Sequence, residues 1–307
     1  MRIIALFGPT GVGKTAVAVA LAQRLRARGE DPVAVSADAL QVYAGMETLT
    51  GVASPAQRAQ LEHRLISFVP VDATFSAGQY AQLAHAQIDE LLDAGRRPLV
   101  VGGTGLYLRA ALSELSLRPP PAEGARERWT AELERVGAPR LHARLRERAP
   151  WAAARIDPND RQRVVRALEL ADLGELTDPD TGEPPAGESE LWSEQLRRPT
   201  LLLGLTMERA ALYAAIDARV DAMLAAGVRE QVRRAHAAGA SQTARKALGF
   251  EELLAGDVEA MKRRTRNYAK RQLTWMRKLA RVHTLDVTGR TAQEIAGEIG
   301  GRLDAGA

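Results

Sequence analysis

The stretch IIALFGPTGVGKT, residues 3–15, decides the fold. Its first five residues, Ile3 to Phe7, are all apolar, which is typical of a short buried strand. The rest is a complete G-x-x-x-x-G-K-[ST] phosphate loop, made of Gly8, Pro9, Thr10, Gly11, Val12, Gly13, Lys14 and Thr15. A helical pattern of apolar residues follows over 16–25, so the loop stands between a strand and a helix, as the motif requires.

Each part of this loop has a role in binding phosphate. The glycines let successive backbone N–H groups point inward around an anion, and the helix that starts near Lys14 adds the positive end of its dipole. Lys14 brings a point charge, and the Thr15 hydroxyl can bind Mg²⁺. The motif therefore predicts binding of a di- or triphosphate, although kinases, ATPases and other enzymes all share it.

Short apolar runs recur along the chain with helical patterns between them. Runs at 33–35, 98–101, 200–205 and 282–287 predict further strands, and 79–94 predicts a helix. Short buried strands that alternate with helices indicate a parallel sheet covered on both faces. We therefore expect an α/β fold with a P-loop NTPase-like parallel sheet core.

A proline run at 119–121 interrupts this rhythm. The segment from there to about 173 is helical and rich in arginine, with 11 Arg against 7 acidic residues between 123 and 166, and 177–187 is a polar, turn-rich loop. We expect 1–120 to form the first part of the core and 121–196 an inserted all-helical lobe. Residues 197–307 then return to the core with basic C-terminal helices, two or three of them between 209 and 281.

The composition of the 307 residues, 46% hydrophobic and 26% charged, is that of an ordinary globular protein. Because there is no cysteine, disulfides, thiolate metal sites and cysteine nucleophiles are excluded. No window holds the ~18 apolar residues of a membrane span, and no charged leader with a cleavage site precedes the first strand. We therefore expect a cytoplasmic protein with no membrane partner.

Two residues follow predicted strands at the edge of the sheet where ligands bind in open α/β folds. Asp38 comes after the strand at 33–35, and Thr104 comes after the strand at 98–101. A carboxylate at this edge can accept a proton or hold a metal through water. The sequence alone leaves a second interpretation open for both residues, as caps of the helices that follow.

Residues 262–281 carry nine Lys or Arg and no acid, with aromatic and apolar residues interleaved at near-helical spacing. A helix with charges of one sign is typical of a surface that binds a polyanion. Because 37 of the 42 basic residues in the chain are arginines, a solvated face of an Arg-rich protein remains the alternative.

The order and spacing of eight segments resemble those of the tRNA dimethylallyltransferases, also called tRNA isopentenyltransferases. The segments are GPTGVGKT (8–15), SADALQVYAGM (36–46), HRLI around His63, the stretch 98–112, RIDPNDRQRVVRALEL (155–170), the stretch 209–224, ALGFEEL (247–253) and YAKRQLTWMRK (268–278). One departure is Val52, where the family commonly has a lysine.

The resemblance implies transfer of a dimethylallyl group from dimethylallyl diphosphate to N6 of the adenosine immediately 3′ of the anticodon in tRNA. The phosphate loop, 8–15, and Arg219 would hold the diphosphate, with Mg²⁺ at Thr15. Asp38 would be the general base, and Lys14, Thr15 and Thr104 would complete the catalytic set. The enzyme would act as a monomer.

The resemblance also implies contacts between the inserted lobe, other segments and the anticodon stem-loop. The residues expected to contact tRNA are Asp38, Ala39, Leu40, Gln41, Thr104, Arg126, Gln162, Arg163, Val164, Val165, Arg166, Lys246, Ala247, Leu248, Gly249, Phe250 and Glu251. Two other hypotheses remain on the residues alone. One is a small-molecule kinase with the lobe as a lid, and the other is a non-catalytic RNA-binding protein with a vestigial phosphate loop.

Overall fold

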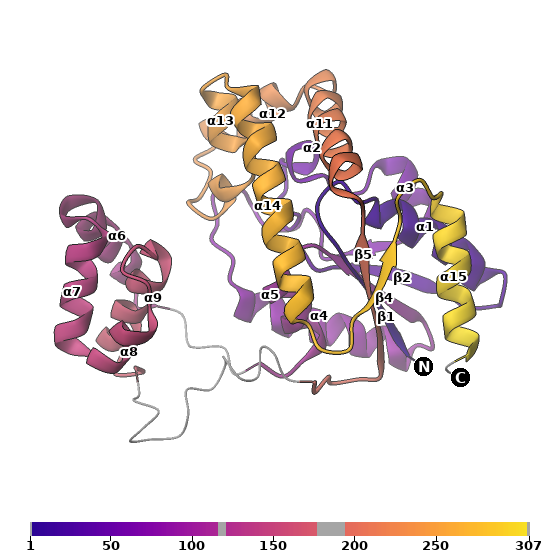
Figure 1. Ribbon diagram of the computed structural model, residues 1–307, viewed down its shortest axis with the longest axis horizontal. Coiled ribbons are helices and arrows are strands. Elements are labelled where there is room, and N and C mark those ends of the chain that lie inside the picture. Colours follow the sequence, from indigo (N-terminus) through magenta and orange to yellow (C-terminus); the bar gives the residue numbers. More distant parts are fainter. Residues whose placement is uncertain (1, 116–120, 177–193, 306–307) are drawn as a thin grey trace. The chain divides into compact units, whose positions relative to one another are not determined.

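Strand β1 (Ile3–Phe7) lies inside a six-stranded sheet whose order is β3-β2-β4-β1-β5-β6. The computed structural model describes residues 2–115, 121–176 and 194–305, and all strand pairs in this sheet are parallel (Figure 1). The other strands are β2 (Pro32–Ser36), β3 (His63–Arg64), β4 (Arg97–Gly102), β5 (Thr200–Thr206) and β6 (His283–Asp286). The predicted fold class is confirmed, and only the two-residue strand β3 had no apolar run to reveal it.

The register of the sheet brings three loops to one edge. Phe7 of β1 pairs with Gly102 of β4, and Ser36 of β2 pairs with Val101, so these strands end side by side. The segments that follow them carry the phosphate loop, Asp38 and Thr104 respectively. Parallel strands therefore gather, at their carboxyl ends, residues that lie far apart in the sequence.

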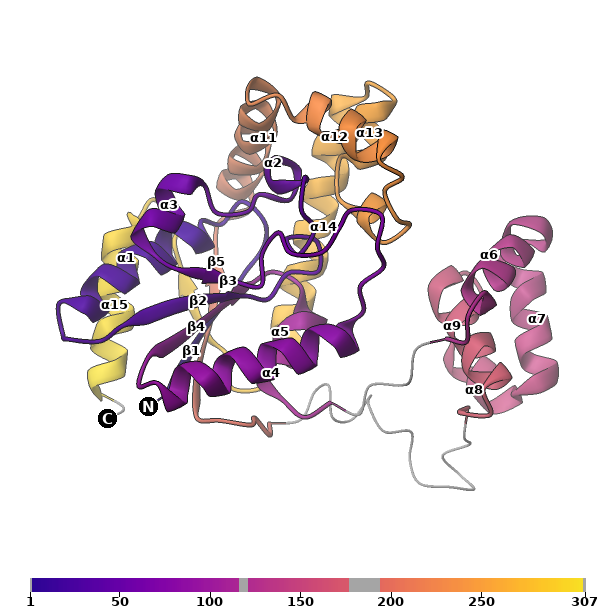
Figure 2. The same ribbon diagram turned by 180° about the vertical axis from the view of Figure 1, so that it is seen from behind.

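Helices cover both faces of this sheet. On one face α1 (Lys14–Arg26) packs against α15 (Ala292–Ala305), and on the other α4 (Ala77–Asp93) packs against α5 (Gly105–Leu112) (Figures 1 and 2). The helices predicted at 16–25 and 79–94 are confirmed as α1 and α4. Helix α15 was not predicted.

A second group of helices surrounds the carboxyl edge of the sheet. It consists of α2 (Glu47–Thr50), α3 (Pro55–Gln60), α11 (Arg209–Ala225), α12 (Val228–Ala237), η1 (Ala244–Lys246), α13 (Phe250–Leu254) and α14 (Val258–Lys278). The described residues between 209 and 281 thus form four α-helices and one 3₁₀ turn, more than the two or three predicted. Gly227 and Gly256, both with φ of 78°, allow the tight turns that divide them.

Contacts divide the chain into two compact units. The first is Met1–Glu114 with Trp192–Ala307, and the second is Leu115–Leu191. The second unit contains α6 (Ala125–Val136), α7 (Ala138–Arg148), α8 (Pro150–Arg155) and α9 (Arg161–Asp172), which pack around an apolar core of their own. The loop predicted at 177–187 lies outside the described residues. In the ranges that the structure describes, no helix is both long enough and apolar enough to span a bilayer.

Candidate active site

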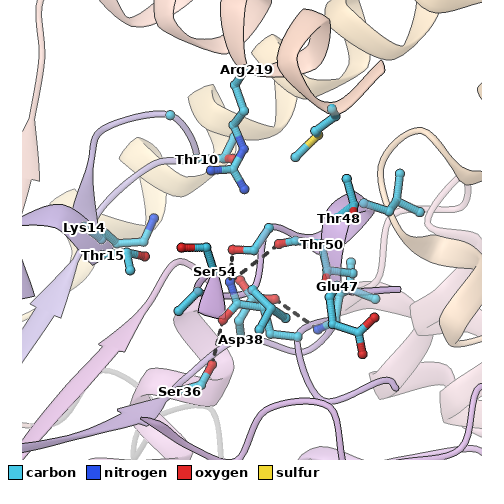
Figure 3. Close-up of a pocket in the computed structure, with 18 of the residues that line it drawn as sticks. Thr10, Lys14, Thr15, Ser36, Asp38, Glu47, Thr48, Thr50, Ser54 and Arg219 are labelled. Carbon is cyan, nitrogen blue, oxygen red and sulfur yellow. Dashed lines mark hydrogen bonds between the residues drawn. The ribbon is translucent and has the colours of Figure 1, made fainter. Parts of the chain in front are cut away.

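A cavity of about 790 Å³ opens in the first unit at the carboxyl edge of the sheet. The phosphate loop, the loop after β2, the segment 47–58, and helices α11 and α14 all contribute to its wall. Figure 3 shows Lys14 and Arg219 entering it from different elements, with Asp38 on the side of the sheet. The sequence-predicted residues Lys14, Thr15, Asp38 and Arg219 therefore lie around one space.

The phosphate loop has the backbone that its motif predicts. Gly11 and Gly13 have φ of 85° and 91°, a conformation that favours glycine, and α1 begins directly afterwards at Lys14. The first helical bond runs from the Val17 N–H to the Gly13 carbonyl. The amides before Val17 are therefore not used within the helix, and an anion can accept from them.

The Lys14 ammonium lies over this loop and donates to the carbonyls of Gly8 and Pro9, both at 2.9 Å. An ammonium has three donors, so one remains for a ligand. Burial lowers the pKa of Lys14 to about 8; the negative charge of Asp38 opposes this shift, and the positive charge of Arg219 adds to it. An anionic ligand between Lys14 and Arg219 would stabilise both cations.

Arg219 reaches the cavity from α11, and burial lowers the pKa of its guanidinium. Its head lies against Gly51, just after α2, and points into the cavity (Figure 3). Two cations from elements far apart in the sequence thus face the same space. Such an arrangement can neutralise a leaving group that carries several negative charges.

Asp38 does not cap a helix. Its Oδ1 accepts from the Leu40 N–H at 3.0 Å, and the next helix, α2, begins only at Glu47. Burial raises the pKa of the carboxyl, while hydrogen bonds from the Leu40 and Gln41 amides and the charge of Lys14 partly oppose this. A carboxylate with a raised pKa is a better proton acceptor than an ordinary aspartate.

Thr104 stands at the N-cap position of α5, but its hydroxyl makes no capping bond. Instead it accepts from the Ala39 N–H at 3.3 Å, and Tyr268 of α14 lies close to it. Thr104 therefore lies between the loop that carries Asp38 and α14. Gln41 stabilises the same loop, because its amide accepts from the Ser36 hydroxyl at 2.9 Å and donates to the Gly51 carbonyl at 3.1 Å.

Three residues of this site were not predicted as functional: Gly51, Tyr268 and Gln272. Gly51 gives no sequence signal beyond being a glycine. Tyr268 and Gln272 are part of the segment YAKRQLTWMRK, four residues apart, so they share one face of α14. That spacing is the signal that could have identified them.

The expected tRNA-contacting residues do not all lie at this cavity. Ala247 and Leu248 line it, and the rest of the segment 246–251 runs from the end of η1 into α13, with the Phe250 side chain buried. Arg126 lies on α6, and residues 162–166 lie on α9, in the second unit. Val164 and Val165 have their side chains in the core of that unit.

The chain is similar to known proteins over nearly its whole length. A family model described as IPP transferase matches residues 41–279. A tRNA dimethylallyltransferase of Symbiobacterium thermophilum is 41% identical over 309 residues, covering 97% of this chain and 93% of that protein. One from Rhodospirillum centenum is 42% identical over 291 residues, covering 90% and 88%. The crystal structure of a tRNA isopentenylpyrophosphate transferase from Bacillus halodurans superposes with a TM-score of 0.68 at 32% identity, covering 99% of this chain and 97% of that one.

Proposed function

The chain belongs to the IPP transferase family of tRNA dimethylallyltransferases, and we propose that its cavity transfers a dimethylallyl group from dimethylallyl diphosphate to N6 of the adenosine immediately 3′ of the anticodon. The main support for this proposal is that Lys14, Arg219 and Asp38 lie around one cavity. Two cations suit a departing diphosphate, and one carboxylate with a raised pKa suits an amine.

On the donor side, the phosphate loop and Arg219 hold the diphosphate. Diphosphate leaves an allylic carbon readily only when its growing charge is neutralised. The amides at the start of α1, the third donor of Lys14 and the guanidinium of Arg219 supply that neutralisation. Because these groups are already in place, little reorganisation accompanies the reaction.

The residues also fit Mg²⁺ bound together with the donor. Mg²⁺ usually keeps several waters and binds one or two protein groups plus substrate phosphates. The Thr15 hydroxyl lines the cavity beside the phosphate loop, and the described residues contain no cluster of three or more His, Asp or Glu that would hold a metal alone. Thr15 would hold the ion, which supplies further charge neutralisation of the diphosphate when bound.

On the acceptor side, Asp38 takes the proton. The N6 nitrogen attacks C1 of the dimethylallyl group, a nitrogen–carbon bond forms, and the carbon–oxygen bond to diphosphate breaks with its electron pair leaving on oxygen. The Asp38 carboxylate accepts the proton that N6 loses. Thr104, which accepts from the Ala39 N–H and lies close to Tyr268, contacts the nucleotide from the neighbouring loop.

The tRNA must deliver an unstacked base to this cavity, since the reacting amine is not accessible inside a stacked anticodon loop. We propose that residues 38–41 and 246–251 contact the flipped base and its neighbours, and that Arg126 and residues 162–166 of the second unit contact the anticodon stem-loop. Val164 and Val165 act there through the packing of α9, because their side chains are buried. Action as a monomer stays a prediction of the resemblance.

Mass spectrometry of nucleosides tests the reaction. Unmodified tRNA incubated with the enzyme, Mg²⁺ and dimethylallyl diphosphate should gain one dimethylallyl group on adenosine. Tests with ATP in place of the donor cover the alternatives: phosphorylation of a small molecule would support a kinase, and tRNA binding with no reaction would support a non-catalytic protein. Either outcome without prenylation would contradict the proposal.

A matched pair of carboxylate variants tests the base. Asp38→Asn should lower the single-turnover rate by about 10²-fold or more, the usual contribution of a general base, while binding of pyrophosphate persists. Glu47→Gln removes another carboxylate that lines the cavity and should change the rate less than about threefold. An Asp38→Asn rate within tenfold of the wild-type rate would exclude Asp38 as the base.

A further inference from the structure

The inner face of α14 contacts the two loops that flank the cavity. Tyr268 lies close to Thr104, and one turn later Gln272 lies between the phosphate loop and Gly103. Another turn along, Trp275 packs over Gly105 so closely that a Cβ on that glycine would stand 2.1 Å from the indole. The helix that carries basic residues on its outer face thus fixes the loops after β1 and β4 with its inner face.

Gln272 is the buried centre of this contact, with 4% of its surface exposed. Its Oε1 accepts from the Thr10 N–H at 2.9 Å, and its Nε2 donates to the Gly103 carbonyl at 2.8 Å. The two partners fix the orientation of the amide, because one can only donate and the other can only accept. A glutamate lacks the donor, and a methionine of similar length lacks both functions.

The side-chain amide of Gln272 lies so close to Gly103 that no side chain fits at this position. A Cβ on Gly103 would stand 2.4 Å from Nε2 of Gln272, 3.1 Å from the Gly8 carbonyl and 3.3 Å from the Lys14 ammonium. The loop after β4, the phosphate loop and α14 therefore meet here without room for one more carbon atom. The Lys14 ammonium lies directly beside this crowded contact.

Two amides of the phosphate loop are already used within the protein, and a second set at the start of α1 is not. The Thr10 N–H is used by Gln272, and the Val12 N–H lies 3.4 Å from the Pro9 carbonyl. The amides of Gly13, Lys14 and Thr15 stand at the start of α1, before the first intrahelical bond. An anion at the loop would accept from this second set and not from Thr10.

We propose that Gln272 is a positioning residue for the diphosphate: it holds the Thr10 amide away from the anion and orients the loop so that the amides of residues 13–15 and Lys14 face it. This inference rests on the proposed binding of a diphosphate at the phosphate loop, but not on prenyl transfer. Gln272 acts through the loop and does not itself touch the diphosphate. It also couples the donor site to α14 and, through Tyr268, to the loop of Thr104.

Binding of inorganic pyrophosphate with Mg²⁺, measured by calorimetry, tests the role of Gln272. Gln272→Met keeps the length of the side chain but removes both hydrogen bonds, and we expect the Kd for pyrophosphate to rise about tenfold. The KM for the prenyl donor should rise in parallel, while the Kd for tRNA changes less than twofold. Thr274→Val is the control, since its exposed hydroxyl donates to the Lys270 carbonyl and accepts from Arg277, both on the same helix, and it should leave both constants unchanged.

Amide hydrogen exchange in the wild-type protein tests the same inference without a substitution. The Thr10 amide should be protected in the free protein and should change little when pyrophosphate is added. The amides of residues 13–15 should gain protection only when pyrophosphate is present. This measurement decides the matter even if Gln272→Met does not fold.

The possible outcomes separate this inference from the proposed function. No binding of pyrophosphate to the wild-type protein would overturn the donor site itself. Binding to the wild-type protein with an equal Kd for folded Gln272→Met would overturn the role of Gln272 alone. Protection of the Thr10 amide that appears only with pyrophosphate would do the same, because Thr10 would then belong to the set that binds the anion.

Discussion

Gly51 makes room for Arg219. A Cβ built on Gly51 would stand 1.6 Å from Nη2 of the Arg219 guanidinium and 2.7 Å from its central carbon. Gly51 lies just after α2, has φ of +66°, and accepts a hydrogen bond from Gln41 through its carbonyl. The missing side chain therefore lets an arginine from α11 enter the cavity over a loop that follows α2.

Gly51→Ala should push the guanidinium out of its place and raise the Kd for pyrophosphate about tenfold, the size expected for one charge-assisted hydrogen bond. In an Arg219→Ala background the same substitution should add little, because the two changes remove one interaction. Calorimetry on the four proteins of this cycle measures the coupling.

Gly45→Ala is the matched control for the backbone strain. Gly45 has φ of +79°, but a Cβ there would meet nothing within 4 Å. Its substitution should lower the stability by a similar amount without changing the Kd for pyrophosphate. If the two alanine variants weaken binding equally, strain and not the contact with Arg219 is responsible.

The buried Lys14 predicts how donor binding depends on pH. Its pKa is lowered to about 8 in the free protein, so the ammonium loses its charge as the pH rises above 8. The affinity for pyrophosphate should therefore be highest below pH 8 and should fall above it. Binding curves between pH 7 and 9.5 would show this as a break near 8.

Lys14→Ala separates this effect from the titration of pyrophosphate itself. The variant binds more weakly at every pH, and its curve should lack the break near pH 8. A break of equal size in both proteins would assign it to the ligand and would contradict the charge loss at Lys14.

How far the sequence predicts this site depends on whether the contacts are local. The phosphate loop is contiguous, so eight neighbouring residues and the strand before them predict its backbone. The contact from Gln272 to Thr10 spans 262 positions, and the spacing that places Gln272 on one face of α14 does not indicate Thr10 as its partner. Strand β3 has only two residues and depends on pairing with β2, so no periodic pattern reveals it.

A family resemblance that is found segment by segment does not tell which side chains of a segment can reach a ligand. It marks 162–166 as one unit, but a helix sends successive side chains to different faces. In α9 this places Val164 and Val165 in the core and leaves Gln162 and Arg163 exposed. Which members of such a segment reach a ligand is decided by packing, and packing is seen only in the structure.

The basic residues of α14 divide into two groups with different expected effects on RNA binding. Lys262 and Arg266 are half-buried and pair with Asp221 at 2.7 Å and Asp217 at 2.6 Å. Lys270 is exposed and stacks on Tyr213 at 5.9 Å. An exposed cation on this face suits a phosphate, whereas a paired one is already neutralised.

Lys270→Ala should therefore weaken tRNA binding and reduce the slope of log K against log salt by about one, the effect of one lost phosphate contact. Arg266→Ala should lower the thermal stability slightly and leave the slope unchanged, because its partner is Asp217. Filter-retention measurements of tRNA binding between 50 and 300 mM salt, about a sixfold range, distinguish the two expected slopes. Equal slopes for Lys270→Ala and wild type would favour the solvated-face interpretation of α14.

Glu169 is a fully buried carboxylate in the second unit that pairs with two arginines. It accepts from Arg126 at 2.5 and 2.7 Å and from Arg166 at 3.0 Å. Burial raises the pKa of Glu169, but the hydrogen bonds and charges of Arg126 and Arg166 outweigh it, so the net pKa is lowered. The ionised form is therefore the one that stabilises α6 against α9.

Glu169→Gln should lower the free energy of unfolding of this unit at pH 7 by about 2 kcal/mol, less than the ~3–5 kcal/mol of a fully buried pair because Arg126 is 43% exposed. Since the folded pKa lies below the unfolded one, this stabilisation is present above pH 4.5 and disappears as the pH falls through the folded value. Urea unfolding followed by the fluorescence of Trp129 and Trp151 should thus show a gap between variant and wild type that narrows in acid. The Asp172 carboxylate is 20% exposed, so Asp172→Asn should lower the free energy of unfolding by less than Glu169→Gln does. A difference between Glu169→Gln and wild type that stays constant down to pH 3 would show that the shape of Glu169, and not its charge, stabilises the unit.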